Sequence, residues 1–340
     1  MIEPFENKEN IDLSNEYILE KQSGKYWKMI ISFCIFFIII IILGIFVIKL
    51  SIDEFNEHKI EINCLYEIDN TINEQLLFKE FENYSNSISM FINGELTEYK
   101  ITQNFSKKGQ YKVTYLVNEA LKLENMFKNI GNLISIIVTS HKGYLNFSTS
   151  HAFSNCTKLE SISLSINTKL INMSHMFSGC KNLKNITFNL GKNPENTNET
   201  RLTPKVKIMA NMFSGCTSLT SLNLSLFNTN DTIDFSSMFD NCLLLKSLDL
   251  SNFYTNLTTN MTSMFSNCKN INYIDISNFN TSQVLNMSYM FYNCEKLQNL
   301  TYNNDTFKPN NASFDSMFDN CPVEKPYWYK DKCDSIIDFL

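Results

Sequence analysis

The sequence predicts a mainly β solenoid with short helical turns, built from stacked copies of one phrase of about 26 residues. The pattern Met-Phe-x-x-Cys-x-x-Leu-x-x-Leu-x-Leu recurs and is clearest in residues 211–229, 237–255 and 263–281. Cysteines mark one slot of the phrase at successive intervals of 24, 36, 26, 26, 26 and 27 residues. They are Cys156, Cys180, Cys216, Cys242, Cys268, Cys294 and Cys321. The longest interval holds a polar insertion, residues 191–204, which should form a surface loop.

Each copy offers one short strand and one turn. Leu222 and Leu224 alternate with polar neighbours, and this period of two predicts a strand whose leucines face inward. Met238, Phe239 and Cys242 recur at a spacing typical of a short helical turn with one apolar side. This phrase is typical of leucine-rich repeats, so about seven strands should pair in a parallel sheet roughly 34 Å long. One copy cannot bury its apolar edge alone, so equivalent side chains should stack.

The phrase NxxxMFxxCxxLxxLDLSNFNT resembles the BspA-type leucine-rich repeats, the bacterial surface protein 26-residue repeat family of bacterial and protist surface proteins. The resemblance covers about Met126 to Cys321. It departs in the first copy, where Ile130 stands in the cysteine slot, and in the last, where residues 322–325 replace the strand. The departures look like the ends of the array. The resemblance implies a cell-surface interaction protein, often adhesive, with no catalytic residues.

Twenty consecutive uncharged residues, Met29–Ile48, precede the repeats and could span the roughly 30 Å of a bilayer core. We expect residues 1–25 to be a cytosolic tail and residues 26–50 to be a transmembrane signal anchor. The alternative is a cleaved signal peptide, but the run is long for one and no small-x-small cleavage site follows it. A slight excess of lysines before the span favours a single-pass type II protein with its ectodomain outside the cytosol. The family resemblance implies that this ectodomain stands at the cell surface.

Residues 51–120 should form a β-rich N-terminal capping unit with strands at 59–69 and 110–117. Asn93 and Gly94 stand between apolar runs, which predicts a hairpin. Such a unit would cover the apolar end and the open strand edge of the first repeat. The alternative is an independent binding module.

The leucine-rich-repeat solenoid should occupy residues 121–321, entered through a helical segment at 119–127. A C-terminal cap should follow at 322–340, because two prolines early in it cannot donate to a strand ladder. We expect its aromatic run, residues 327–329, to lie over the last repeat.

The cysteine column invites a metal or disulfide interpretation. No C-x-x-C pair occurs, however, and stacked thiols have parallel side-chain directions that do not suit disulfides. We therefore expect buried free thiols, with no metal and no cofactor. Cys333 stands outside the column and could form a disulfide with Cys321; the alternative is two unpaired thiols.

The sequence does not favour an enzyme. None of its four histidines lies in H-E-x-x-H, and neither G-x-S-x-G nor G-x-x-x-x-G-K-[ST] occurs. The net charge of −6, with Arg201 as the single arginine, argues against the basic stripe typical of nucleic-acid partners.

The outward strand positions form a polar band that a solenoid could present as a binding platform. We predict ligand-binding residues at Ser221, Ser247, Asp249, Tyr273 and Asp275. Hydroxyls and amides predominate, which fits weak, repeated contacts with an extracellular protein or carbohydrate ligand. The alternative is a merely solvated face.

Sixteen N-x-S/T sequons occur, all after the apolar span. The candidates for glycosylation include Asn83, Asn104, Asn230, Asn256, Asn260, Asn286 and Asn311. The alternative is chance, because the chain is rich in asparagine.

Together these features predict a single-pass, membrane-anchored cell-surface glycoprotein. Its leucine-rich-repeat ectodomain should mediate adhesion or protein and carbohydrate recognition without catalysis. The alternative is a structural surface-coat protein that self-associates without an external ligand.

Overall fold

A computed structural model describes residues 40–41, 60–84, 86–118, 123–140, 148–166, 170–190, 204–308 and 311–330. The chain divides into two compact units, residues 1–57 and 58–340. Of the predicted membrane span, the structure describes residues 40–41 only, and these are helical. Within the described ranges, we find no helix with the length and apolar character needed to cross a membrane.

The second unit begins with β-strands that pair antiparallel. The first is β1 (Ile60–Ile68), which pairs with β6 (Gly109–Val117) over its whole length. Alternate residues of β1 are buried, as its period of two predicts. On its other edge β6 pairs with β3 (Ile88–Ile92), which forms a hairpin with β4 (Glu95–Thr97). The strands predicted at 59–69 and 110–117 are therefore present.

The predicted hairpin turn is also present. Asn93 and Gly94 both have positive φ, 52° and 90°, as a two-residue turn between right-twisted strands requires. Outside the main sheet, β2 (Glu74–Gln75) pairs with β5 (Thr102–Gln103), and a 3-10 helix, η1, spans Lys79–Tyr84.

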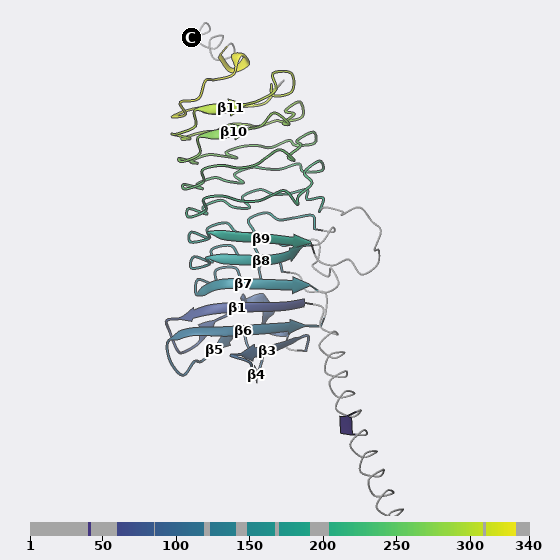
Figure 1. Ribbon diagram of the computed structural model, residues 1–340, viewed down its shortest axis with the longest axis vertical. Helices are drawn as coiled ribbons and strands as arrows, with labels where there is room; N and C mark the ends of the chain where they lie inside the picture. The colour runs from purple at the N-terminus through teal and green to yellow at the C-terminus, as the bar shows by residue number, and fades with distance from the viewer. Residues whose placement is uncertain are drawn as a thin grey trace, which may run out of the picture. The chain divides into compact units, whose positions relative to one another are not determined.

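The sheet continues from these strands into the repeats (Figure 1). β1 pairs antiparallel with β7 (Leu133–Ser140), the strand of the first repeat. From there the pairing is parallel, from β7 to β8 (Ser161–Ile166) and from β8 to β9 (Asn185–Leu190). The seven strands lie in the order β4-β3-β6-β1-β7-β8-β9. The outer edge of β7 is thus occupied by β1.

Within the described repeats, strand pairing returns near the end of the array, where β10 (Tyr273–Asp275) pairs parallel with β11 (Asn299–Thr301). Isolated parallel bridges, such as Ile208–Asp234 and Asp234–Asn260, link the copies between. Residues 221–224 and 247–250 form no strands, so the predicted continuous sheet of about seven parallel strands is wrong for these two copies. Their inward leucines nevertheless keep their places, and Leu224 and Leu250 are buried. Strand hydrogen bonds are not needed in these two copies, because a second series of backbone hydrogen bonds holds the copies in register.

That ladder runs along the Met-Phe segments. In the copy from 237 to 242, the N–H groups of Ser237, Phe239 and Asn241 donate to carbonyls of the next copy at 2.8, 2.9 and 2.9 Å. The intervening residues Met238, Asp240 and Cys242 instead donate to the carbonyl three residues back, at 3.0–3.1 Å. Alternate N–H groups therefore close turns and link copies.

The short helical turns predicted for these segments are replaced by tight turns. The residue before each Met-Phe pair and the residue before each cysteine have positive φ, as at Ser237 (51°) and Asn241 (58°). An α-helix of L-residues excludes such angles. The same holds for the helix predicted at 119–127: its described residues, 123–127, form turns, and Asn125 has a φ of 60°. A left-handed residue at every fourth position of the segment breaks the helix, and every second N–H then donates to the next copy instead of within a helix.

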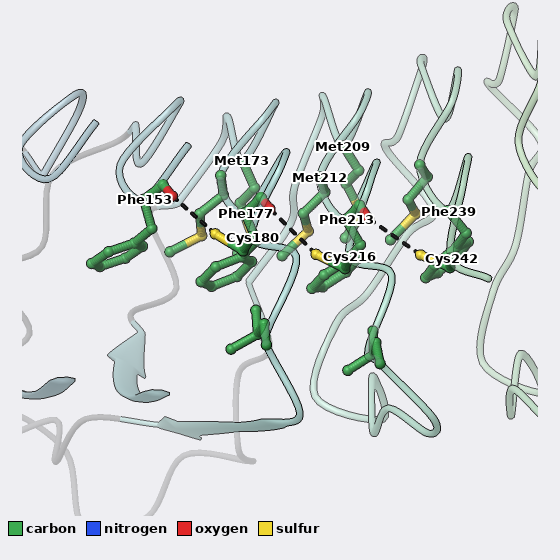
Figure 2. Close-up of a cluster of buried hydrophobic side chains, with 14 of the residues drawn as sticks. Phe153, Met173, Phe177, Cys180, Met209, Met212, Phe213, Cys216, Phe239 and Cys242 are labelled. Atoms are coloured by element: carbon green, nitrogen blue, oxygen red, sulfur yellow. Dashed lines mark hydrogen bonds between the residues drawn. The ribbon is translucent and has the colours of Figure 1, made fainter. Parts of the chain in front are cut away.

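The core consists of columns of identical side chains (Figure 2). Phenylalanines stack with centroid distances of 5.3–5.7 Å and interplanar angles of 6–12°. This column contains Phe127, Phe153, Phe177, Phe213, Phe239, Phe265, Phe291 and Phe318. Each cysteine from Cys156 to Cys294 lies beside it, fully buried. Stacking of equivalent residues, expected from the repeat, is therefore confirmed for this column.

Two of the three aromatic residues predicted to cover the last repeat, Trp328 and Tyr329, pack on it. The ring centroid of Tyr329 lies 5.0 Å from that of Phe318, and that of Trp328 lies 5.8 Å from that of Phe307. Tyr327 points away and is 75% exposed.

Candidate binding face

The predicted ligand-binding residues occupy one side of the solenoid, on the segments that follow each cysteine. Ser221, Ser247 and Tyr273 hold the same slot in three successive copies, and all three are exposed. Asp249 and Asp275 share another slot two residues further along. Period-two alternation turns both slots outward, while the residues between them, Leu248 and Ile274, are buried in the core.

The structure brings three of the outward groups together at β10 and β11. The hydroxyl of Tyr273 donates to Oδ2 of Asp275 at 3.3 Å. The hydroxyl of Thr301 donates to the Tyr273 oxygen at 3.5 Å. Tyr273 is 43% exposed, so its ring remains open to a partner while its hydroxyl is oriented by its neighbours.

The aspartates also end their segments. Oδ1 of Asp249 accepts the N–H of Ser251 at 3.0 Å, and Oδ1 of Asp275 accepts that of Ser277 at 2.9 Å. Such local bonds to a backbone two residues ahead favour a turn. Hydrogen bonding from the serine that follows lowers the pKa of Asp249 and of Asp275 below the usual aspartate range. Both side chains are therefore anionic at neutral pH.

This arrangement presents hydroxyls, two carboxylates and one aromatic ring on an extended surface. It suits a ligand that hydrogen-bonds at several points and stacks on one ring, as carbohydrates and polar protein surfaces do. Among the described residues, no group of three or more His, Cys, Asp or Glu side chains is placed to hold a metal ion.

The structure places the candidate glycosylation sites as follows. Asn104, Asn230, Asn256 and Asn311 are exposed. Asn260 and Asn286 are half-buried, and their Oδ1 atoms accept the N–H of Thr262 at 3.1 Å and of Ser288 at 2.9 Å. The backbone of Asn83 lies in η1, and its side chain is outside the described part of the chain. Glycosylation at all seven stays a prediction.

The column cysteines from Cys156 to Cys294 are free and buried, as predicted. Six of them donate a hydrogen bond to the carbonyl of a phenylalanine in the preceding copy, as Cys180 does to Phe153 at 3.0 Å (Figure 2). Burial raises the pKa of Cys180 to about 12 and raises the pKa of the other five as well. Cys321 is buried, but Cys333 lies outside the described residues, so their disulfide stays a prediction.

The family model described as "Mycoplasma protein of unknown function, DUF285" matches residues 147–246 and 207–327. These overlapping matches span more than half of the 340 residues. The chain belongs to the DUF285 family. The matched range contains the repeats from the His151 copy onward and ends at Tyr327, the first residue of the C-terminal aromatic run. No curated protein and no solved structure matches the chain.

One concave feature of the structure has no counterpart among the sequence motifs. A cavity lies between the N-terminal strands and the first turns of the solenoid, with Asp69, Glu74, Asn132 and Lys158 among its lining residues. These residues are up to 89 positions apart in the chain and belong to no motif, so no sequence signal marked them.

Proposed function

We propose that this DUF285 protein is a non-catalytic surface protein whose solenoid recognises an extracellular protein or carbohydrate. Membership of the family and the solenoid fold support a surface-repeat protein. The finer assignment of the repeats as BspA-type leucine-rich repeats belongs to the proposal and is supported by the recurring phrase. The adhesive role rests on that resemblance together with the exposed polar face.

The observation that carries the proposal is the group formed by Tyr273, Asp275 and Thr301. Its three side chains are linked by hydrogen bonds yet stay on the surface, so they add little to the core. An exposed tyrosine whose hydroxyl is already oriented offers contact area at low entropic cost. Asp249, Ser247 and Ser221 extend the same face along the preceding copies.

The test measures capture of cells, glycans and extracellular matrix proteins by the full chain held in nanodiscs. The variant carries Tyr273→Ala, Asp249→Asn and Asp275→Asn, because an asparagine retains the Oδ1 acceptor that ends each segment. We expect capture to weaken about tenfold or more, the usual cost of losing an aromatic anchor. The matched control carries Tyr327→Ala, Asp305→Asn and Asp319→Asn, the same residue types at exposed positions off this face.

Capture at the wild-type level by the variant at Tyr273, Asp249 and Asp275 would remove this face from the proposal. Capture lost equally in both variants would mark a non-specific charge effect. Self-association of the wild-type chain with no bound ligand in any screen would favour the structural-coat alternative.

The membrane arrangement is part of the same proposal. Residues 26–50 would anchor the chain as a type II protein, with the repeats outside the cytosol at the cell surface. The apolar run Met29–Ile48 supports this placement. Protease treatment of sealed vesicles tests it: an N-terminal tag should be protected while the repeats are digested. Digestion of the tag with protection of the repeats would indicate the opposite orientation in the membrane.

A further inference from the structure

An open cleft of about 720 Å³ lies at the C-terminal end of the array, where the last two copies of the repeat meet the segment that follows them. Tyr292 and Glu295 line it from one copy, Asp319 and Asn320 from the next, and Lys325 from the following segment. Its volume falls within the roughly 300–1,000 Å³ range of small-molecule sites. None of the residues of the candidate binding face lines this cleft, so a site here is separate from that face.

A series of hydrogen-bonded side-chain amides, one from each copy, ends in this cleft. Nδ2 of Asn267 donates to Oδ1 of Asp240 at 3.2 Å, and Nδ2 of Asn293 donates to Oδ1 of Asn267 at 2.9 Å. Nδ2 of Asn320 in turn donates to Oδ1 of Asn293 at 2.8 Å. Because the ionised carboxylate of Asp240 can only accept, it fixes the direction of every amide in the series. The series therefore ends on an oxygen, Oδ1 of Asn320.

This terminal oxygen is an acceptor that a ligand can reach. Asn320 is exposed, and its Oδ1 receives no hydrogen bond within the described part of the chain. Each earlier amide oxygen of the series receives an N–H from the next copy, whereas no further copy follows Asn320. Hydrogen-bonded amides polarise one another, and an anionic first member strengthens the effect. An amide N–H on a ligand would continue the series.

Tyr292, which lines the cleft, packs against a strained neighbour. Its ring and that of Tyr289 meet edge to face, with a centroid distance of 5.7 Å and an interplanar angle of 80°. Tyr289 has a φ of 61°, which a bulky side chain rarely adopts, and the same slot holds Asn, His or Ser in other described copies. Strained residues of this kind gather at functional sites. Tyr289 thus positions Tyr292, whose half-buried ring offers a stacking surface to the cleft.

The charges of the lining favour a neutral ligand. Glu295 forms an ion pair with Lys269 at 2.6 Å. This pair leaves one carboxylate, that of Asp319, and one ammonium group, that of Lys325. The two opposite charges balance, so the cleft as a whole attracts neither an anion nor a cation.

We propose that this cleft binds a neutral N-acetylated amino sugar. The acetamido N–H donates to Oδ1 of Asn320, and the C–H face of the sugar ring stacks on Tyr292. The ammonium group of Lys325 donates to a sugar hydroxyl. A hexose without the acetamido group lacks the N–H donor, and a polypeptide segment lacks the flat face of a sugar ring.

The test uses the full chain in nanodiscs and saturation-transfer difference NMR, which reports the ligand protons that contact the protein. The methyl β-glycoside of N-acetylglucosamine should give a saturable response at its acetamido and ring protons. Methyl β-glucoside should bind at least about tenfold more weakly, because it has no amide N–H. N-acetylalanine methylamide is the probe for a polypeptide and should also bind at least about tenfold more weakly.

Variants at Asn320 test the acceptor. Asn320→Gly removes it without backbone strain, because Gly179 and Gly215 occupy the same slot with positive φ in other copies. We expect binding of the N-acetylglucosamine glycoside to weaken about tenfold or more. The matched control Asn155→Gly makes the same change in the same slot of an early copy, outside the cleft lining, and should bind as the wild type does. Asp319→Asn removes only a charge from the lining and should also bind as the wild type does.

Tyr289→Ser tests the positioning role. Ser263 occupies the same slot in the preceding copy with a φ of 56°, so the backbone accepts serine there. The melting temperature should stay the same or rise, because a strained tyrosine is removed. Binding of the glycoside should nevertheless weaken about threefold or more, because Tyr292 loses its support. A purely structural tyrosine would give the opposite result, a lower melting temperature with unchanged affinity.

Several outcomes would overturn the proposal. One is the absence of any saturable response to the N-acetylglucosamine glycoside, and another is unchanged affinity in Asn320→Gly. Equal binding of methyl β-glucoside would show that the amide N–H is not recognised, and equal or tighter binding of N-acetylalanine methylamide would assign the cleft to polypeptides. The variant at Tyr273, Asp249 and Asp275 should bind the glycoside as the wild type does, so this site and the candidate binding face are tested independently.

Discussion

The Sγ atom of Cys242 donates a hydrogen bond to the backbone carbonyl of Phe213, in the preceding copy of the repeat, at 3.2 Å. The thiol is thus both an apolar filler and a link between copies. It occupies the slot that the periodic sequence assigns to it, and the same link recurs from Cys156 to Cys294.

This relationship predicts that the thiols of the column react only after unfolding. Burial raises the pKa of the Cys242 thiol well above its ordinary value, and the thiolate is the reactive form. Alkylation of the native chain, read by peptide mass spectrometry, should leave the seven described cysteines from Cys64 to Cys294 unmodified, and urea should expose all seven. The same digest reports whether Cys321 and Cys333 are linked. Rapid labelling of Cys242 in the native chain would contradict its burial.

The phenylalanine column should carry much of the stability of the array. The ring of Phe239 lies between those of Phe213 and Phe265, at centroid distances of 5.7 and 5.6 Å, and it is fully buried. Phe239→Ala should therefore lower the free energy of unfolding by about 3–5 kcal/mol, measured by urea titration. The control is Leu285→Ala, at a position 67% exposed, which should change it by less than about 0.5 kcal/mol.

Because each copy touches only its neighbours, the damage should be local. Hydrogen exchange in Phe239→Ala should rise most in residues 237–242 and in the copies on either side, and least in β1. Uniform loss of protection throughout the second unit would show that the array unfolds as one cooperative body.

Positive φ should make Gly179 sensitive to substitution by alanine. Gly179 has a φ of 76°, and a Cβ atom placed on it would collide with Oδ1 of Asn155. Gly179→Ala should cost about 1–3 kcal/mol of stability, because it adds this collision to a left-handed backbone. Gly131→Ala is the matched control: Gly131 has no positive φ, and its Cβ would lie 3.4 Å from Oγ1 of Thr157. Comparable losses for both variants would refute the backbone explanation.

The stacked imidazoles of His151 and His175 should make the first repeats sensitive to acid. Their centroids lie 4.4 Å apart with an interplanar angle of 6°. Burial lowers the pKa of both side chains, and the positive charge of Lys128 lowers the pKa of each further. The folded state thus favours the neutral rings. Their contribution to stability is complete above the unfolded histidine pKa of about 6.5, and is lost as pH falls through the lowered folded pKa.

Urea titrations at pH 8 and pH 5 measure this effect. The variant His151→Asn/His175→Asn tests its origin, because Asn125 and Asn211 occupy the same slot with positive φ in the flanking copies. We expect the decrease in stability between pH 8 and pH 5 to be smaller in the variant than in the wild type. An unchanged decrease would assign the acid sensitivity to other groups.

Much of the fold could be predicted from particular residues. The recurring Met, Phe and Cys slots indicated which side chains stack, and Phe239 and Cys242 lie in the core as expected. The Asn93-Gly94 turn and the strands β1 and β6 could also be predicted, because hairpin turns and strands have local sequence signals. The candidate face was predicted from alternation, although the link between Tyr273 and Asp275 depends on side-chain geometry.

Other features had no local signal. The i, i+1, i+4 spacing of Met238, Phe239 and Cys242 fits a helical turn, yet Ser237 and Asn241 adopt positive φ so that alternate N–H groups reach the next copy. The pairing of β1 with β7 and the environment of Asn132 both depend on segments distant in the chain.

The sequence by itself determined the register of this protein, because side chains repeated at a fixed interval can share one environment only when copies stack in step. The tertiary structure alone decided where the backbone hydrogen bonds lie. Backbone hydrogen bonds join each copy to the next along the Met-Phe turns, whereas residues 221–224 and 247–250 form no strand. The reason is that the partner of each N–H or carbonyl belongs to a neighbouring copy, so the local sequence does not specify it.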